Sequence, residues 1–172
     1  FPDTYQYHKG EPETAVLKRA HALLLKTLNT EWETRAANLP YENPYQALIM
    51  ASIIEKETGT AADRDMVAAV FVNRLKVPMR LQTDPTVIYG MGEEFQGNIR
   101  KSDLQRDTPF NTYVHDGLTP TPIATASRAS IHAALNPADS DVLYFVARGD
   151  GSSQFSKTLP EHNAAVRQYQ LN

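Results

Sequence analysis

Apolar residues in the first forty positions recur every three or four residues, which is the repeat of an amphipathic helix. They predict a helix from Glu11 to about Ala37, preceded by an extended lead-in over residues 1–10. The apolar stripe consists of Val16, Leu17, Ala20, Leu24, Leu28 and Trp32. We therefore expect a lead-in and an N-terminal helix in residues 1–40, followed by the main core in residues 41–172.

Residues 41–59 predict a second helix, whose apolar side chains cover most of its circumference. Asn43 is suited to the N-cap, the proline after it to the first helical position, and Gly59 to the end of the helix. Only the side that carries Ser52 and Lys56 is polar. We therefore expect this helix to be largely buried, with its Ser52 side facing water.

Residues 80–125 combine polar side chains with many turn formers. Only two short helices are expected there, one after Asp84-Pro85 and one around Ser102 to Leu104. The stretch is too polar for the core, and a long irregular segment in a compact domain is more often a binding surface than a linker. We therefore expect the ligand to bind there.

The remaining segments predict a mainly helical chain with one small sheet. A third helix is expected from residue 63 to 75, and the short GTAA turn before it predicts that it packs on the second helix as a hairpin. Residues 126–135 and 159–169 predict two further helices. The apolar run 142–148 predicts a strand, and a GDG turn joins it to a second short strand predicted over 153–158. Strands grouped in one antiparallel hairpin place the chain in the α+β class.

Composition and charge exclude several classes of function. The 172 residues are 41% hydrophobic and 22% charged, as in an ordinary soluble globular protein, and the net charge is −3. Without a basic patch, a nucleic-acid partner is excluded. The absence of cysteine excludes a disulfide framework, a thiolate zinc site and a cysteine nucleophile. The longest apolar run, residues 47–54, is far shorter than the ~20 residues needed to cross a bilayer.

The histidines, serines and glycines form no known catalytic or cofactor-binding motif. The five histidines show no HxxxH or HExxH spacing, so no metal site is expected. The chain has no GxSxG elbow and no GxxxxGK[ST] loop, which leaves serine hydrolases and nucleotide-binding proteins without support. We expect no cofactor.

Glu55 is the first candidate for acid–base chemistry, because a carboxyl group within a buried helix needs an explanation. On a helical wheel it falls between Ala51 and Leu48 and so faces apolar surroundings. Burial there is expected to raise its pKa and keep it neutral, as a general acid must be. The alternative is a structural ion pair with Arg64, Arg74 or Arg80.

Glu57 has a nearly equal claim, since it falls between Met50 and Ile53 on the same wheel. Periodicity does not choose between the two acids. Residues two positions apart on a helix point about 200° away from each other, so they do not form a two-carboxylate pair in one cleft. A second acid would come from another segment, and Asp84 is the obvious source, although an N-cap role before the following proline suits it better.

A polar cluster in the turn-rich stretch is suited to sugar binding, because it offers amide, hydroxyl and aromatic groups. Such groups bind sugar hydroxyls and N-acetyl groups, although short polar side chains also simply form turns. The cluster consists of Gln82, Thr83, Asp84, Asn111, Thr112 and Tyr113. Its role stays open between these two interpretations.

Four segments together resemble the endolytic murein transglycosylases of the MltG or YceG-like family. The central block is ASIIEKETGTAADRDMVAAVFVNRLKVPMRLQTDPTVIYGMG, residues 51–92. The others are FPDTYQY (1–7), FNTYVHDGLTPTPIATAS (110–127) and LYFVARGDGSSQFSKTLPEHNAAV (143–166). The motifs occur in the same order over nearly the whole chain. The resemblance implies a single catalytic domain over residues 1–172, with a lysozyme-like active-site helix that carries the glutamate.

The resemblance implies cleavage within peptidoglycan strands, at the β-1,4 bond between N-acetylmuramic acid and N-acetylglucosamine. The reaction proceeds without water and leaves a 1,6-anhydro sugar end. The motif match assigns both proton transfers to one residue, Glu55. This agrees with the absence of a second acid on the same helix face, whereas most glycosidases use two carboxylates.

The same match places the substrate-binding residues in the turn-rich stretch. Gln82, Thr83 and Asp84 are expected beside the sugar, and Asn111 and Tyr113 are expected to line the same groove.

The resemblance also implies a location and partners. Family members usually carry an N-terminal membrane helix and a LysM-like module, and act on the outer side of the cytoplasmic membrane, facing the periplasm, near penicillin-binding protein synthases. This chain begins at Phe1 without an initiator Met or signal-like segment, so we expect a soluble catalytic part that lacks the anchor and the module.

Two other functions compete with this hypothesis. One is a muramidase of lysozyme type, in which Asp84 or Asp63 would support attack by water. The other is a non-catalytic glycan-binding module that positions cell-wall synthases, in which Glu55 is only structural.

Overall fold

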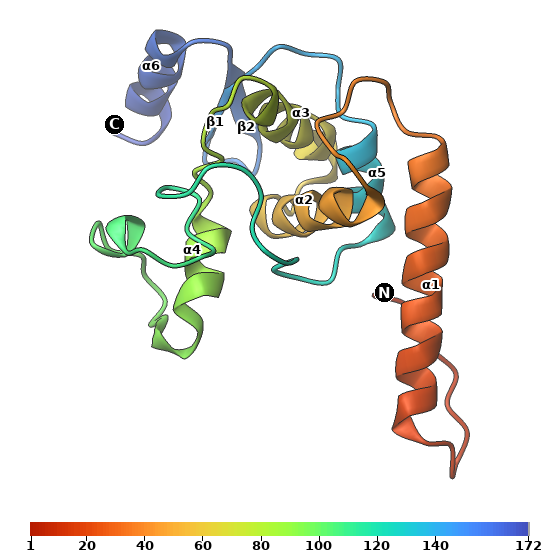
Figure 1. Cartoon of the computed structure of the whole chain (residues 1–172). Helices are drawn as coiled ribbons and strands as arrows, with labels where there is room; N and C mark the ends of the chain where they lie inside the picture. Colours follow the sequence, from red (N-terminus) through yellow and green to blue (C-terminus); the bar gives the residue numbers. More distant parts are fainter. Residues whose placement is uncertain (172) are drawn as a thin grey trace.

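The computed structural model describes residues 1–171, and within them six α-helices, three short 3₁₀ turns and one two-stranded antiparallel sheet. The helices are α1 (Glu13–Glu33), α2 (Pro44–Glu57), α3 (Arg64–Lys76), α4 (Asp84–Met91), α5 (Arg128–Leu135) and α6 (Leu159–Tyr169). The strands are β1 (Tyr144–Ala147) and β2 (Ser153–Ser156). In Figure 1, α2, α3 and α5 form the centre, with α1 along one side and α4 and α6 on the other. The α+β class is confirmed, and the expected elements occur with their ends shifted by a few residues.

The last turns of α1 attach this helix to α5. Leu28 is buried in the main core, and Glu31 is only 5% exposed. The Glu31 carboxylate accepts hydrogen bonds from Arg128 Nε at 2.9 Å and from His132 Nδ1 at 2.8 Å. Burial acts to raise the pKa of Glu31, but the hydrogen bonds from His132 and Arg128 outweigh it and lower the pKa. An ionised carboxylate therefore joins α1 to α5.

α2 lies at the centre of the core. As predicted, Asn43 caps it, with Oδ1 accepting a hydrogen bond from the Gln46 backbone N–H at 3.1 Å. The expectation that Ser52 faces water is wrong, because this residue is fully buried. Its hydroxyl donates to the Ile49 carbonyl at 2.7 Å and accepts from the Ile123 N–H at 2.9 Å. A remote loop thus covers Ser52, while Lys56 on the same side is exposed as expected.

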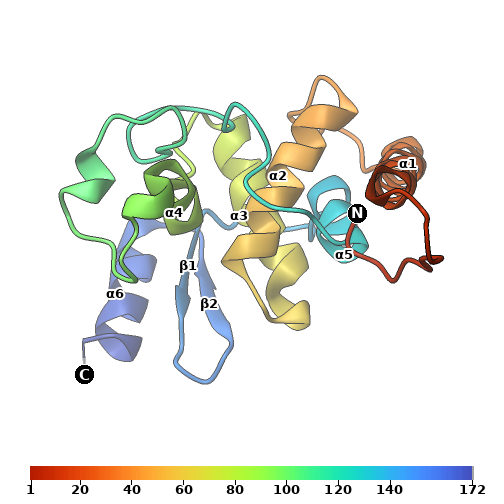
Figure 2. The same cartoon turned by 90° about the horizontal axis from the view of Figure 1, so that it is seen from below.

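The packing partner of α2 is also only partly as expected. α2 contacts α3, the neighbouring helix in the sequence, but it packs most extensively on α5, more than seventy positions further on (Figure 2). The buried side chains of α2 are Ala47, Ile49, Met50, Ala51, Ser52, Ile53 and Ile54. Because these cover nearly all sides of the helix, one neighbour is not enough to bury them.

The turn-rich stretch 80–125 contributes to the core, contrary to the expectation that it is too polar. Leu81, Thr86 and Thr112 are each at most 2% exposed. The two threonine hydroxyls lie 2.8 Å apart, and the Thr112 carbonyl accepts from the Gln82 N–H at 3.1 Å. Polar side chains can be buried when they hydrogen bond one another, and here these bonds join the start of the stretch to Thr112.

The strands and α6 form a small unit beside α3. Phe145 of β1 pairs with Phe155 of β2 in the antiparallel register, and its ring packs edge-on against Phe71 of α3. α6 begins with a capping box, in which the Thr158 hydroxyl and the Glu161 carboxylate satisfy each other's backbone N–H groups. In Figure 1 this unit lies above α4.

Candidate active site

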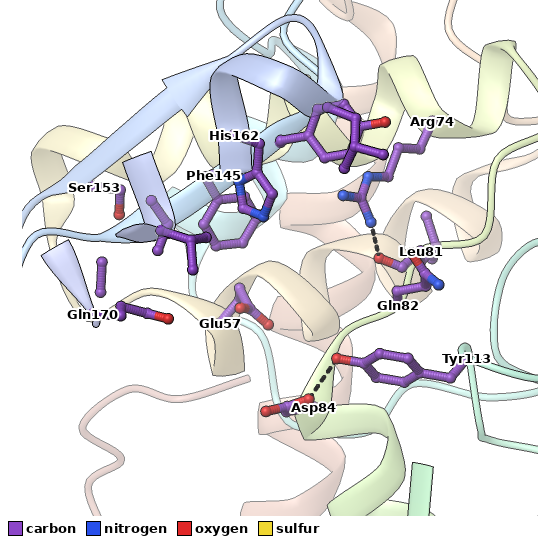
Figure 3. Close-up of a pocket in the computed structure, with 15 residues that line it drawn as sticks. Glu57, Arg74, Leu81, Gln82, Asp84, Tyr113, Phe145, Ser153, His162 and Gln170 are labelled. Atoms are coloured by element: carbon purple, nitrogen blue, oxygen red, sulfur yellow. Dashed lines mark hydrogen bonds between the residues drawn. The ribbon is translucent and has the colours of Figure 1, made fainter. Parts of the chain in front are cut away.

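A cleft of about 560 Å³ lies between residues of α2, α3 and α4 and residues of the β1–β2 hairpin and α6 (Figure 3). Its polar and charged lining residues include Glu57, Arg74, Gln82, Asp84, Tyr113 and His162. They come from segments that are distant in the sequence, and the fold brings them together. Three of them, Gln82, Asp84 and Tyr113, belong to the predicted sugar-binding cluster.

Glu57, on the last turn of α2, is the carboxyl group in the cleft with the most perturbed surroundings. Its Oε2 accepts a hydrogen bond from Thr83 Oγ1. Burial raises the pKa of Glu57, and the nearby Asp84 carboxylate adds to the increase, while Thr83 and Arg74 oppose it. The net shift is upward, so Glu57 keeps its proton to a higher pH than an ordinary glutamic acid.

Glu55 has different surroundings and does not line the cleft. Its Oε2 accepts hydrogen bonds from the Ser127 backbone N–H at 2.9 Å and the Ser127 hydroxyl at 2.6 Å, at the start of α5. Burial acts to raise the pKa of Glu55, but the bonds from Ser127 and Ser130 and the charge of Arg64 outweigh it and lower the pKa. The expectation that burial keeps Glu55 neutral is therefore wrong, because hydrogen-bond donors at a helix N-terminus stabilise a carboxylate.

The alternative interpretation of Glu55, a structural ion pair, is not observed either. In residues 1–171 no arginine lies within ion-pair distance of its carboxylate. Arg80 instead pairs with Asp116 at 3.0 Å. The catalytic assignment of Glu55 stays a prediction, without the raised pKa on which it rested.

Asp84 and Tyr113 face the cleft as a hydrogen-bonded pair, as Figure 3 shows. The Tyr113 hydroxyl donates to Asp84 Oδ1 at 2.7 Å. Burial raises the pKa of Tyr113, and the hydrogen bond to Asp84 raises it further, so the phenol stays protonated and keeps donating. Asp84 is also the first residue of α4, but its side chain forms no N-cap bond there. Its carboxylate is therefore oriented toward the cleft by Tyr113.

Gln82 and Thr83 have distinct places in the site. Gln82 is exposed in the cleft, and its backbone has a φ of 50°, in the left-handed region that a residue with a side chain rarely adopts. Such strain is typical of functional positions. Thr83 is only 2% exposed and lies behind Glu57, to which its hydroxyl donates. Thr83 is therefore placed to orient Glu57 rather than to contact a ligand.

Asn111, the fifth predicted binding residue, does not line the cleft. It is 1% exposed, and its Nδ2 donates to the carbonyls of Asp103, Leu104 and Arg106 at 2.7–3.2 Å. Its Oδ1 accepts from the Tyr113 backbone N–H at 2.9 Å. Asn111 thus holds the loop in shape and places Tyr113, although the sequence favoured a direct contact with sugar.

Arg74 of α3 was considered only as a possible partner of Glu55, yet it lines the cleft. Its Nε donates to the Leu143 carbonyl at 2.7 Å, and its Nη1 donates to the Leu81 carbonyl at 2.6 Å. Burial lowers the pKa of this guanidinium. In the sequence, Arg74 interrupts an otherwise apolar stripe of α3, and this interruption could have indicated a functional position.

Tyr144 and His162 form an aromatic part of the cleft wall that the sequence analysis missed. Their rings stack with centroids 5.2 Å apart and an angle of 23° between their planes. Burial and the charge of Arg74 lower the pKa of His162. Its buried Nδ1 has no hydrogen-bond partner in the described part of the chain. Because the two residues come from β1 and α6, no local spacing could have paired them.

Two general features of residues 1–171 complete the description. No helix among them is both long enough and apolar enough to cross a membrane. Nor does any group of three histidine or acidic side chains lie close enough together there to hold a metal ion.

Comparisons with known proteins agree on one family. The sequence profile of the YceG-like family matches residues 1–168. The chain is 43% identical to an endolytic murein transglycosylase of Bacillus subtilis over 98% of its own length and 46% of that protein. It is 30% identical to an endolytic murein transglycosylase of Streptococcus pneumoniae, over 98% of this chain and 31% of that one. The chain thus spans less than half the length of these curated relatives.

A solved structure shows the same fold. A yceG-like protein from Listeria monocytogenes superposes with a TM-score of 0.81 at 40% sequence identity. The match covers 95% of this chain and 53% of the other.

Proposed function

The chain belongs to the YceG-like family, and from this premise we propose that it is an endolytic lytic transglycosylase of peptidoglycan. It cleaves the β-1,4 bond between N-acetylmuramic acid and N-acetylglucosamine within a glycan strand and leaves a 1,6-anhydro end. The names of the relatives support the type of reaction. A cleft with an acid, amides and aromatic rings in its walls is suited to a sugar chain.

The observation that carries the proposal is Glu57, a carboxyl group with a raised pKa in this cleft. In the proposed reaction Glu57 donates its proton to the glycosidic oxygen, and the bond from the muramic C1 to that oxygen breaks. The oxygen of the muramic C6 hydroxyl then bonds to C1, and the Glu57 carboxylate takes the hydroxyl proton. Glu57 ends protonated, as it began, so one residue serves as acid and base.

The surroundings of Glu57 support both halves of this cycle. Burial favours the protonated acid before cleavage. After cleavage, the Thr83 hydroxyl donates to the carboxylate, and the positive charge of Arg74 favours it. We therefore assign to Glu57 the role that the sequence analysis assigned to Glu55, and to Glu55 a role in joining α2 to the start of α5 through Ser127.

A second candidate function is hydrolysis by a muramidase, and Asp84 is the observation in its favour. Its carboxylate faces the same cleft as Glu57 and is held by Tyr113. Most glycosidases that use water need two carboxylates across the scissile bond. A water molecule activated by Asp84 would give a reducing end instead of an anhydro end.

The test is mass spectrometry of the fragments that the chain releases from uncross-linked peptidoglycan strands. We expect products one water lighter than those of a lysozyme, lost in Glu57→Gln and retained in Glu55→Gln. Products of full mass would select the muramidase. Loss of product in Glu55→Gln alone would restore Glu55 as the acid, and binding without any product would select a glycan-binding module.

The location and partners follow from the substrate. Peptidoglycan lies outside the cytoplasmic membrane, so we place this domain on the periplasmic side, in a longer protein that is anchored in that membrane. There it would act beside penicillin-binding protein synthases, which supply new strands. Co-purification of the full-length protein with a synthase, from membranes treated with a cross-linker, tests this placement.

A further inference from the structure

Arg74 is a buried cation at the wall of the cleft. The residue is 8% exposed. Its Nε and Nη1 donate to the backbone carbonyls of Leu143, Leu81 and Arg80, at 2.7, 2.6 and 3.4 Å. Its Nη2 makes no hydrogen bond to any residue in 1–171. Figure 3 shows the guanidinium directed into the cleft, above Leu81.

No carboxylate in the described chain neutralises this charge. The seven ion pairs of residues 1–171 do not include Arg74. Glu57, which also lines the cleft, interacts with this charge, but burial raises the pKa of Glu57 and so opposes its ionisation. His162, also in the cleft, has a lowered pKa and adds no positive charge near neutrality. The guanidinium lies 5.4 Å from the centre of the Tyr144 ring, so the wall carries one positive charge that has an aromatic neighbour but no ion-pair partner among the described residues.

The hydrogen bonds that Arg74 makes within residues 1–171 leave one of its three nitrogens free. Two of its nitrogens already join α3 to the residue before β1 and to the segment before α4 through carbonyl bonds. Burying a charge without an ion-pair partner is costly. The free Nη2 is a donor in a fixed position, and charged donors bind carboxylates more strongly than neutral groups.

We propose that Arg74 is the anchor of a carboxylate-binding subsite in the cleft, next to Glu57. The inference rests on the proposed function for the nature of the ligand. In peptidoglycan the carboxylate has two possible sources, the lactyl group of a muramic acid without peptide, or a free carboxylate of the peptide stem. An oligomer of N-acetylglucosamine has neither group, so this subsite distinguishes peptidoglycan from chitin-like chains.

Binding is tested on the native chain with soluble probes that lack the scissile bond. The disaccharide of N-acetylglucosamine β-1,4-linked to N-acetylmuramic acid carries the lactyl carboxylate. Two controls lack this carboxylate: the same disaccharide with a lactyl carboxamide, and di-N-acetylchitobiose. The stem source is tested with a disaccharide–peptide whose stem carboxylates are either free or amidated. NMR titration then gives each dissociation constant.

A lactyl source predicts that the acid disaccharide binds at least about tenfold more tightly than its carboxamide and than chitobiose. A stem source predicts the same ratio between the free and the amidated disaccharide–peptide. If all probes bind within about twofold of one another, the subsite does not exist.

Arg74→Gln tests the residue itself, with Arg80→Gln as the matched control, since Arg80 lies outside the cleft lining and pairs with Asp116. We expect the preference for the carboxylate to vanish in the first variant and to persist in the second. Persistence in Arg74→Gln overturns the proposal.

Arg74→Gln loses three hydrogen bonds to backbone carbonyl groups. If this variant does not fold, a measurement on the native chain replaces it. In the native chain the Arg74 Nε–H resonance should then shift with the acid probe and not with its carboxamide, and an unmoved resonance overturns the proposal. None of these measurements requires cleavage. A chain that prefers the carboxylate but yields no product therefore fails only the proposed function.

Discussion

Glu55 and Glu57 are two positions apart on α2, and their pKa values shift in opposite directions. Glu55 meets the N-terminus of α5, where the Ser127 N–H and hydroxyl donate to it. Glu57 lies in the cleft, where burial and the Asp84 carboxylate outweigh the hydrogen bond from Thr83. One helix thus presents a carboxyl group with a lowered pKa on one side and a carboxyl group with a raised pKa on the other.

The opposite shifts predict opposite pH dependences of stability. Glu57 has a raised folded-state pKa, so its stabilising contribution is complete below its ordinary value of 4.5 and is lost as the pH rises through the raised value. Glu55 has a lowered pKa, so its contribution is present above 4.5 and is lost as the pH falls through the lowered value.

The stability of Glu57→Gln relative to the native chain is therefore expected to increase as the pH rises from 4 to 8. Glu55→Gln should be destabilised by about 1 kcal/mol at pH 7, because charged hydrogen bonds to Ser127 become neutral ones, and the deficit should shrink in acid. Urea unfolding of the three proteins from pH 8 down to well below pH 4.5 measures both trends, because the change for Glu55 occurs below its ordinary pKa. A constant difference for either variant would mean that its pKa is not shifted.

Thr83 is expected to set the pH at which Glu57 loses its proton. Its hydroxyl donates to the carboxyl group and lowers the pKa, against the larger effect of burial. Thr83→Val removes the donor with little change in shape, so the pKa of Glu57 should rise and the alkaline limb of the kcat profile should move to higher pH. Thr83→Ser keeps a hydroxyl and serves as the control, with a limb close to that of the native chain.

Much of the fold could be predicted from the sequence because its signals are local. The helix starts depend on caps such as Asn43 and Thr158, which act within one turn. The choice between Glu55 and Glu57 could not be made, since the wheel gives both an apolar neighbourhood. Their difference comes from Ser127 and Thr83, which lie 72 and 26 positions away along the chain.

The surroundings of Ser52 in the core also come from a residue that is distant in the sequence. They lead to a prediction about stability. Its hydroxyl is the acceptor for the buried Ile123 N–H, so Ser52→Ala leaves that donor unpaired. We expect a loss of about 1–3 kcal/mol in the free energy of unfolding. Ser102→Ala, at an exposed position, should change it by less than about 0.5 kcal/mol. Equal stability of the two variants in chemical denaturation would mean that the bond to Ile123 contributes nothing.

Gln82 and Asn111 were both expected to bind sugar, but their alanine variants should give different results in assays of activity and stability. Gln82 is exposed in the cleft, so Gln82→Ala should raise KM for glycan strands while the free energy of unfolding stays within about 0.5 kcal/mol. Asn111 is buried and bonds three carbonyls and one N–H, so Asn111→Ala should cost about 2 kcal/mol or more.

The activity of Asn111→Ala distinguishes a positioning role from direct binding. Because Asn111 holds the Tyr113 backbone, its loss should weaken the orientation of Asp84, whose charge raises the pKa of Glu57, and so lower kcat at temperatures where the variant is still folded. Activity assays well below the midpoint of thermal unfolding, together with circular dichroism, measure this. A rise in KM for Asn111→Ala with unchanged stability would instead place its side chain on the sugar.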